Sequence, residues 1–453
     1  MLLRWFDTTP DLLALHRRYP ARYPFLLESA VTGTPQSRYS LLLALPGERL
    51  VLDENGKLSG AFADNHHRFL DALDAWWADQ RPDQPDLTGS DLPFHGGWFV
   101  YLGYEMAGEI EPTLALSAPP ERTPVAVAVR CRGAVIIDHA KQRSAVLVEP
   151  GHDEALDGLV RDVLAEDASG LDPGDLVLGA VREDAPDLYL VGVEACKRYI
   201  RDGDVFQVNL SRAWAVDMRS PVSSASVYAR LRQANPAPFA ALADFGEWAI
   251  ISSSPERLVR VLGERVETRP IAGTRPRGQD RDDDARLSSE LIGHPKERAE
   301  HVMLIDLERN DLGRIAEPGS IRVDELMTVE SYRHVHHIVS NVAGRRRPGV
   351  TPGEVIRAVF PGGTITGCPK VRCMEIIGEL EQEGRGAYTG SLGYLDRNGD
   401  MDLNILIRTI TRQGDTLRFR TGAGIVADSD PRAELEETRH KARGLLRALG
   451  QAG

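Results

Sequence analysis

The sequence predicts an α+β fold built on large antiparallel sheets. Segments typical of strands and segments typical of helices come in mixed blocks, without strict β-α-β alternation. The chain has 453 residues with 42% hydrophobic content, which suffices for a large core and suggests two or three domains unless large sheets merge them. A stretch rich in Asp, Gly and Pro, residues 166–187, predicts a linker between an N-terminal region, residues 1–165, and a second region, residues 188–453.

The region before this linker is predicted to hold short strands and one helix. Residues 125–129 and 134–137 are apolar and rich in β-branched side chains, which favours two strands. A helix is predicted near residues 65–79. After the linker, a helix at about residues 189–202 leads through a turn into a strand that includes residues 207–211.

The remainder of the chain is predicted to be mostly strands, with a long helix at its end. An acidic segment at residues 279–285 is predicted to be a mobile loop. The predicted strands span residues 248–252, 257–262, 265–269, 387–395, 403–411 and 417–421, and the terminal helix spans about residues 431–449.

The net charge of the chain limits which kinds of molecule we expect it to bind. The formal net charge of -13 argues against nucleic acid or an anionic membrane as the main partner, because both require a basic surface. An anionic small molecule remains compatible, since local Arg and Lys side chains or a divalent cation hold such a ligand inside an acidic protein.

Cysteine usage and the N-terminus indicate the compartment. The four cysteines, Cys131, Cys196, Cys368 and Cys373, show no zinc-binding spacing, and so few in a long chain indicate a reducing compartment without structural disulfides. Residues 1–10 lack the pattern of a signal peptide, and no apolar run reaches the length of a membrane span. We therefore expect a cytoplasmic protein.

Two glutamate pairs with identical spacing stand out as candidate metal ligands. Glu297 and Glu300 form the first pair, and Glu434 and Glu437 form the second. Residues three apart on a helix face the same way, and two such faces together offer the hard oxygen ligands that Mg²⁺ accepts. The alternative for each pair is an ordinary solvated helix face.

The surroundings of the pairs favour the metal interpretation. An apolar run follows the first pair at residues 302–305, so this helix must bury one side beside its charged turn. The second pair follows Gly422 and Gly424, a backbone suited to close ligand approach. Lys441 comes four residues after Glu437 on the same helix face. Opposite charges on one helix face suit a metal beside an anionic substrate.

The chain resembles a known family, the chorismate-utilising enzymes, which include anthranilate synthases, aminodeoxychorismate synthases and isochorismate synthases. The resemblance covers nearly the whole chain and implies a two-layer arrangement of large antiparallel sheets flanked by helices, with Mg²⁺ acting on chorismate. Its motifs lie, in the family's order, at residues 254–257, 270–278, 296–314, 367–372 and 421–441.

The resemblance assigns roles to the acidic residues. Glu300 and Glu437 match direct Mg²⁺ ligands, and Glu297 and Glu434 match positions that bind through water, as Mg²⁺ prefers few carboxylates and retained waters. Chorismate is a dianion whose C4 hydroxyl is a poor leaving group, so the site has to neutralise carboxylates and protonate the departing oxygen. Glu256 matches the general acid, whose pKa burial must raise; without the resemblance it reads as a capping residue after Pro255.

Further residues match substrate contacts. Arg408, a bidentate donor by nature, matches a carboxylate clamp, although alone it reads as an ordinary strand arginine. His337 matches an active-site histidine, with a structural role as the alternative. The other matched polar contacts are Thr274, Thr364, Tyr388, Lys441 and the backbone of Gly273, Gly422 and Gly424.

The identity of the nucleophile depends on Gln207. Members that form isochorismate or salicylate carry a lysine base at this position, where it activates water. Glutamine cannot take up that proton, so the resemblance implies ammonia as the nucleophile. The chain contains no Cys-His arrangement of a glutamine-hydrolysing domain, which implies a separate glutamine amidotransferase subunit as partner and ammonia source.

The product is indicated by local motifs that disagree. The Pro-Gly-Gly turn within residues 360–367, together with residues 207–210, resembles aminodeoxychorismate synthases, and we expect 4-amino-4-deoxychorismate for 4-aminobenzoate and folate synthesis. Ala272 stands where many of these enzymes carry a lysine that attacks C2 of chorismate, so the covalent route is closed. Anthranilate synthases carry this alanine, and anthranilate is the alternative product. If the product is 4-amino-4-deoxychorismate, we expect a noncovalent 2-amino intermediate.

Two further alternatives remain open. Residues 26–29 and 235–239 resemble, imperfectly, the tryptophan pocket of anthranilate synthases, and a vestigial structural pocket is equally compatible. A catalytically silent scaffold with the same fold is the alternative from another class. The full set of clustered carboxylates argues against it, because such groups are costly to retain without function.

Overall fold

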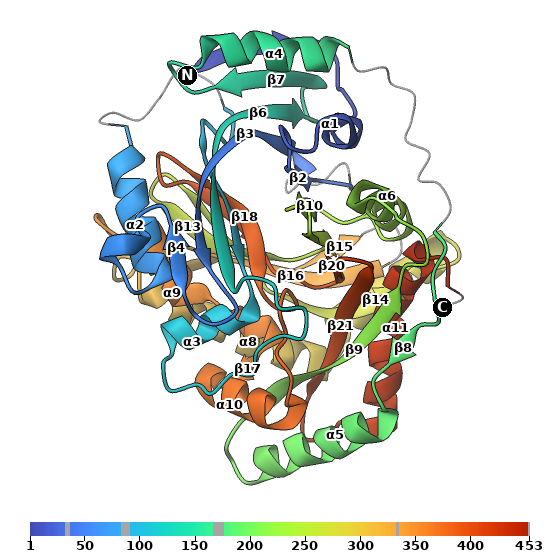
Figure 1. The fold of residues 1–453 in the computed structure, drawn as a ribbon. Helices are drawn as coiled ribbons and strands as arrows, with labels where there is room; N and C mark the ends of the chain where they lie inside the picture. The colour runs from blue at the N-terminus through green and yellow to red at the C-terminus, as the bar shows by residue number, and fades with distance from the viewer. Residues whose placement is uncertain (32–36, 83–90, 166–175, 332–334, 452–453) are drawn as a thin grey trace.

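The computed structural model describes residues 1–31, 37–82, 91–165, 176–331 and 335–451, and it has the α+β architecture expected from the sequence. Within these residues, twenty-one strands join one strongly curled sheet in which every pairing is antiparallel. Eleven α-helices lie around its outer surface (Figure 1).

The curled sheet encloses a core built by strands and loops. Phe25, Phe99, Ile136, Ile250 and Leu392 belong to one buried cluster that contains no helix residue. Two other clusters combine strand faces with the apolar faces of helices. The sheet therefore has an inner face packed against itself and an outer face packed against helices, which is the two-layer arrangement implied by the resemblance.

The described part of the N-terminal region, residues 1–165, contains seven strands. The two strands predicted at residues 125–129 and 134–137 are one long strand, β6, so that prediction was wrong. The first half of β6 pairs with β5 and the second half with β7, and the residues between stay in the ladder. The strands are β1 (Leu2–Phe6), β2 (Phe25–Glu28), β3 (Tyr39–Leu52), β4 (Leu58–Gly60), β5 (Gly97–Leu102), β6 (Ala126–Asp138) and β7 (Arg143–Val148).

Strands from the two ends of the chain are joined directly. β2 pairs with β10 (Phe239–Asp244), and β5 pairs with β18 (Ser391–Asp396). Of the predicted linker, residues 166–175 lie outside the described residues. The part that follows includes β8 (Arg182–Glu183), which pairs with β9 (Gln207–Asp217).

In the C-terminal half the predicted segments contain strands, with two corrections to their bounds, but the strands at residues 271–276, 322–331 and 335–345 were not predicted. The strand predicted at residues 387–395 begins only at Ser391. The strand predicted at residues 403–411 is two strands, because the backbone of Ile405 and Leu406 bonds to Glu256 and Gly390 instead of continuing the ladder. The remaining strands are β11 (Trp248–Ser254), β12 (Arg257–Leu262), β13 (Arg265–Thr268), β14 (Ile271–Pro276), β15 (Arg322–Ser331), β16 (Val335–Arg345), β17 (Gly367–Cys368), β19 (Met401–Asn404), β20 (Thr409–Gln413) and β21 (Thr416–Ile425).

The predicted mobile loop at residues 279–285 is instead the start of a helix. The Asp280 side chain accepts hydrogen bonds from the backbone N–H groups of Asp282 and Asp283, and three acidic residues occupy the first turn. Both features stabilise a helix N-terminus. The acidic run that suggested a loop is therefore a helix-start signal.

The other helices that were predicted lie near their expected positions, whereas the helices at residues 12–18, 107–110, 153–164, 224–234, 352–359 and 370–381 were not predicted. The helix predicted near residues 65–79 begins at Phe69, where the Glu109 carboxylate accepts from the backbone N–H groups of Phe69 and Leu70. None of the helices in the described ranges is long and apolar enough to span a bilayer. The helices are α1 (Leu12–Arg18), α2 (Phe69–Gln80), α3 (Ala107–Ile110), α4 (Asp153–Leu164), α5 (Pro186–Arg201), α6 (Ser224–Ala234), α7 (Arg281–Gly293), α8 (Pro295–Gly313), α9 (Pro352–Val359), α10 (Lys370–Glu381) and α11 (Pro431–Ala448).

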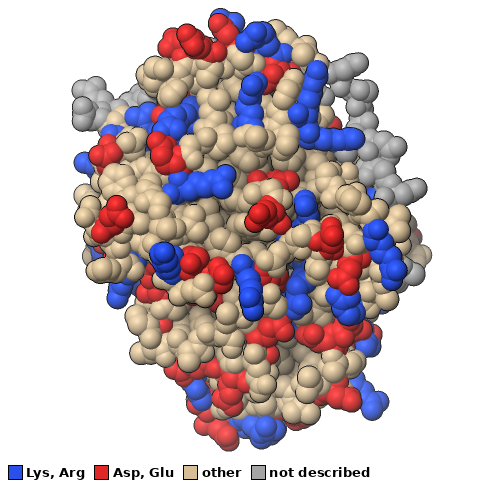
Figure 2. Space-filling view, in the orientation of Figure 1, with Lys and Arg blue, Asp and Glu red and all other residues tan. Residues whose placement is uncertain are grey.

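Charged side chains of both signs are interspersed on the face seen in Figure 2. Lys and Arg alternate with Asp and Glu across this face, so the negative net charge is not gathered there into one acidic surface.

Candidate functional site

A cavity of about 200 Å³ lies where β9, β14 and β21 approach α8 and α11. All the residues predicted from the sequence line it except Glu297, Glu434 and Glu437. Residues that lie far apart in the chain, from Gln207 to Lys441, therefore meet at one place. The predicted residues in its wall are Gln207, Glu256, Ala272, Gly273, Thr274, Glu300, His337, Thr364, Tyr388, Arg408, Gly422, Gly424 and Lys441.

Glu256 is a buried carboxylic acid in this wall. It lies between β11 and β12 with 5% of its surface exposed, and the Thr364 hydroxyl donates a hydrogen bond to its Oε1 over 2.6 Å. Burial raises the pKa of Glu256 to about 7, while the Thr364 hydrogen bond and the charges of Arg408 and Lys441 oppose that rise. Its carboxyl faces the cavity, so the capping alternative is wrong. A carboxyl with such a pKa is only partly ionised at neutral pH, and its protonated form is able to donate a proton.

His337 and Thr274 lie opposite each other on paired strands. β14 and β16 align the two residues, and the Thr274 Oγ1 lies 3.1 Å from His337 Nδ1. Burial lowers the pKa of His337 to about 4, and the Arg408 charge lowers it further. The ring is therefore a neutral imidazole at physiological pH, suited to hydrogen bonding without adding charge.

Arg408 lies between β19 and β20, so the interpretation as an ordinary strand arginine is wrong. Its φ is 51°, in the left-handed region that a non-glycine residue rarely adopts. The Arg408 carbonyl accepts a hydrogen bond from the Ser253 N–H over 3.1 Å. This local backbone strain is held by the surrounding sheet, as is common at binding sites.

Lys441 and the two glycines of β21 form the opposite wall. α11 packs along β21 (Figure 1), and the Lys441 Nζ donates to the Gly422 carbonyl over 3.0 Å. A Cβ atom at Gly422 would come within 2.7 Å of Tyr388 Oη, and one at Gly424 would overlap Gln207 Nε2. Glycine is required at both positions because neighbouring side chains occupy the space.

Gln207 and Ala272 are the two wall residues that bear on the nucleophile. Gln207 is 4% exposed, and its Nε2 donates to Glu300 Oε1 over 3.1 Å. Its Oε1 is buried and has no hydrogen-bond partner among the residues that the structure describes. Ala272 is buried in the wall and offers no nucleophilic atom.

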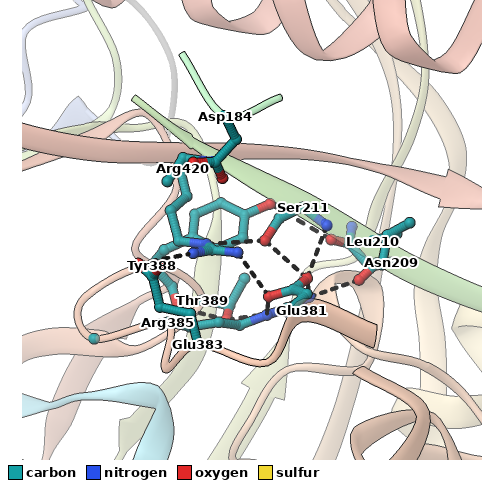
Figure 3. A network of polar contacts seen from close by, with 12 residues as sticks. Asp184, Asn209, Leu210, Ser211, Glu381, Glu383, Arg385, Tyr388, Thr389 and Arg420 are labelled. Carbon is teal, nitrogen blue, oxygen red and sulfur yellow. Dashed lines mark hydrogen bonds and ion pairs between the residues drawn. The ribbon is translucent and has the colours of Figure 1, made fainter. Parts of the chain in front are cut away.

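A buried ionic network supports the wall from behind (Figure 3). The Glu381 carboxylate, at the end of α10, accepts hydrogen bonds from Ser211, Arg385 and Arg420. Burial opposes ionisation of Glu381, yet the charges of Arg385 and Arg420 hold its pKa below the usual range. The Arg385 guanidinium also donates to the carbonyl of Asn209 over 2.6 Å. The network thereby ties β9, β21 and α10 together beneath the cavity.

Sequence reasoning missed several wall residues. Asn209 follows Gln207 by two positions on the same strand, and alternate residues share a face. Arg420 precedes Gly422 by two positions on β21, and Leu304 follows Glu300 by one helical turn. Each lines the cavity. The strand and helix periodicities would have identified all three.

The remaining three glutamates do not line the cavity, and two of them, Glu297 and Glu437, lie beside cations. Glu297 Oε1 is 3.2 Å from Arg275 Nη1, and Glu437 Oε1 is 3.5 Å from Lys441 Nζ. Glu434 lies in the first turn of α11. Among the residues that the structure describes, no three His, Cys, Asp or Glu side chains form a ready-made metal cluster. The chemistry of the four carboxylates nevertheless suits Mg²⁺, which takes a few carboxylate oxygens and retains waters.

A second cavity, of about 320 Å³, is lined by residues of both segments that resemble a tryptophan pocket. β2 and β10 bring Leu27 and Glu28 next to Pro238 and Phe239. The structure therefore places the two segments together. Tryptophan binding in this cavity stays a prediction, and a vestigial pocket is the alternative.

Comparisons with known proteins agree with this geometry. Residues 27–447 match the family described as chorismate binding enzyme. The anthranilate synthase component 1 of Thermus thermophilus is 40% identical over 456 residues, covering 98% of this chain and 96% of that protein. The aminodeoxychorismate synthase component 1 of Bacillus subtilis is 42% identical over 375 residues, covering 80% of this chain and 79% of that protein. The crystal structure of anthranilate synthase component I from Streptococcus pneumoniae has a TM-score of 0.80 and 33% identity, over 92% of this chain and 93% of that chain.

Proposed function

Because this chain belongs to the family of chorismate-binding enzymes, we propose that it aminates chorismate with ammonia and that its product is 4-amino-4-deoxychorismate. Family membership makes it a chorismate-utilising enzyme. The nucleophile, the product, the metal and the partner belong to the proposal.

The choice of ammonia depends on Gln207. Its amide lies in the cavity wall beside Glu300, at the position where water-using relatives carry a lysine base. An amide does not take a proton from water at neutral pH, whereas ammonia attacks without such help. This is the single observation that carries the proposed reaction type.

The wall residues divide the work on the substrate. Arg408 and Lys441 neutralise the carboxylates of chorismate, and the backbone at Gly422 and Gly424 allows close approach. The protonated form of Glu256 donates its proton to the C4 oxygen, so that the C4–O bond breaks and water leaves. Ammonia forms the new C–N bond at C2 while the ring double bonds shift, and the excess proton on its nitrogen returns to Glu256. A second ammonia then adds at C4, the first departs from C2 as ammonia with the proton that Glu256 holds, and the excess proton of the new C4 amine restores Glu256. Ala272 offers no amine for a covalent route.

Magnesium is proposed as the cofactor. When bound, it supplies charge neutralisation for the substrate carboxylate and the departing oxygen. Glu300 and Glu437 would hold it directly, and Glu297 and Glu434 through water, as their carboxylate chemistry allows.

The proposed product depends on the cavity rather than on overall identity. Thr364 and Ile365 of the Pro-Gly-Gly turn line the cavity with Gln207 and Asn209, and these motifs resemble aminodeoxychorismate synthases. Identity over the whole chain averages residues that never touch substrate.

Anthranilate is the second candidate, and two observations favour it. A relative that matches nearly the whole chain and a similar crystal structure are both named anthranilate synthase component 1 or I. Ala272, also in the wall, is the residue that resembles those enzymes. The names of the relatives therefore favour anthranilate, and most of the local motifs favour 4-amino-4-deoxychorismate.

The partner is proposed to be a separate glutamine amidotransferase subunit. The relatives are named as components 1, which implies a second component. With free ammonium, the chain alone should turn over chorismate.

The test is to incubate the purified chain with chorismate, Mg²⁺ and ammonium, with and without an added aminodeoxychorismate lyase. Lyase-dependent 4-aminobenzoate supports the proposed product, and lyase-independent anthranilate supports the second candidate. Isochorismate or salicylate would refute ammonia as the nucleophile. No consumption of chorismate, with Glu256→Gln as the matched inactive control, would favour the scaffold interpretation.

A further inference from the structure

Each proposed metal-binding glutamate pair has its own cation within ion-pair reach. Arg275 Nη1 lies 3.2 Å from Glu297 Oε1, and Lys441 Nζ lies 3.5 Å from Glu437 Oε1. Lys441 has a second role, because it donates a hydrogen bond to the Gly422 carbonyl and lines the cavity. Arg275 does not line the cavity, so its contact with Glu297 calls for a separate explanation.

Arg275 is fixed by three different elements. It belongs to β14, and its Nη1 donates to the Thr274 carbonyl over 3.0 Å. Its Nε lies 3.7 Å from Glu290 of α7, and its Nη1 reaches Glu297 of α8. The side chains of Arg275 and Glu297 are only about one-fifth exposed, at 21% and 20%. The guanidinium is therefore held beside Glu297 in a partly buried site, where charge interactions are screened less than at the open surface.

The Glu297 carboxylate lies close against the backbone of β14. A Cβ atom at Gly273 would come within 2.8 Å of Glu297 Oε2, and Gly273 has a φ of 68°, which glycine adopts without strain. One carboxylate oxygen thus faces Gly273 and the other faces Arg275. The position of this carboxylate is set by β14 as well as by its own helix.

Without a divalent cation, the protein itself has to balance the glutamate pair. Glu297 and Glu300 lie on the same helix face, where like charges three residues apart destabilise the helix. A guanidinium beside Glu297 offsets this repulsion. The same positive charge opposes a divalent cation that approaches the same carboxylate.

We propose that Arg275 is a positioning residue that acts as the internal counter-ion of Glu297: it holds the carboxylate in place in the metal-free protein and yields it when a divalent cation binds. This inference rests on the magnesium site proposed above. Arg275 therefore stabilises the metal-free protein and weakens its affinity for Mg²⁺. A purely structural ion pair would stabilise the metal-free protein without weakening its affinity for Mg²⁺.

The test measures thermal unfolding of the full chain without substrate, first in chelator and then across a Mg²⁺ titration. We expect Arg275→Gln to lower the Tm of the metal-free protein. We also expect it to tighten the apparent Mg²⁺ Kd by about three- to tenfold, seen as a larger Mg²⁺-induced rise in Tm and by calorimetry. Arg275→Lys, which keeps the charge, should restore the wild-type Mg²⁺ response.

The matched control is Arg277→Gln. Arg277 follows β14 directly and pairs at 2.7 Å with Asp284, a carboxylate that belongs to neither glutamate pair. We expect its Mg²⁺ affinity to equal that of the wild type. If the wild type responds to Mg²⁺ and Arg275→Gln responds equally or less, the counter-ion role is overturned. If the wild type neither binds nor responds to Mg²⁺, the proposed metal site itself fails, and the inference fails with it.

Discussion

The Thr364 hydroxyl donates a hydrogen bond to the Glu256 carboxyl over 2.6 Å inside the cavity. This contact favours the ionised carboxylate, whereas burial favours the protonated acid. Burial is the larger effect and raises the pKa of Glu256 to about 7. The residue is thus balanced near neutrality, where a general acid works best.

The first prediction concerns the pH dependence of turnover. If protonated Glu256 is the acid, kcat should fall as the pH rises through about 7, because the carboxyl loses its proton there. A kcat profile between pH 5.5 and 9 at saturating chorismate measures this limb. Glu256→Gln should lose about 10²- to 10⁴-fold in kcat and should no longer show the limb. Retention of wild-type kcat in Glu256→Gln would remove this residue from the mechanism.

The second prediction uses the hydrogen bond itself. Thr364→Val removes a donor that favours ionised Glu256, so the pKa should rise and the falling limb of kcat should move to higher pH. Thr364→Ser keeps the hydroxyl and serves as the control, with its limb at the wild-type position. A limb that moves to lower pH in Thr364→Val would contradict the assigned direction of the contact.

Local signals explain which elements the sequence predicted. The terminal helix was predicted at about residues 431–449, and the structure shows local start signals there, with Asp430 accepting from the Ala433 N–H and Pro431 in the first turn. The start of α7 carries an equivalent signal in Asp280, but its acidic run was interpreted as a loop. The local sequence therefore contained the start signal of this helix, and the prediction of a loop misinterpreted it.

Other features could not be predicted because their causes are distant in the chain. The break between β19 and β20 depends on Leu406 bonding to the Gly390 carbonyl, and the start of α2 depends on Glu109. Glu300 and Lys441 were found through helical spacing, and most of the other predicted cavity residues through family motifs. The contact of Arg420 with Glu381 joins residues 39 positions apart, and no local pattern indicates it.

The third prediction tests the close packing at Gly424. Gly424→Ala would place a Cβ atom on Gln207 Nε2 and displace the amide from Glu300, to which it donates at 3.1 Å. We expect kcat/KM for ammonium to fall at least tenfold, a loss of about 1.4 kcal/mol in transition-state stabilisation. Gly158→Ala in α4 is the matched control, because nothing lies within 4 Å of its new Cβ, and its kinetics should equal those of the wild type. Unchanged kinetics in Gly424→Ala would mean that the Gln207 position is unimportant.

The fourth prediction concerns the stability of the network behind the wall. Glu381 is 1% exposed and lies between the guanidinium groups of Arg385 and Arg420. Glu381→Gln removes the negative charge that Arg385 and Arg420 share. Removing one partner of a buried ion pair destabilises a protein by about 3–5 kcal/mol. We therefore expect a large drop in the denaturant midpoint at an unchanged slope.

Glu383 provides the matched comparison for this network. It pairs with Arg418 at 2.7 Å and lies 3.6 Å from Arg420, but its side chain is 36% exposed. Solvent screens such a pair, so Glu383→Gln should cost about 0–1 kcal/mol. The two variants remove the same charge from residues two positions apart, and their difference measures what burial adds. Equal midpoints for both would mean that the network holds α10, β9 and β21 no more firmly than a surface ion pair does.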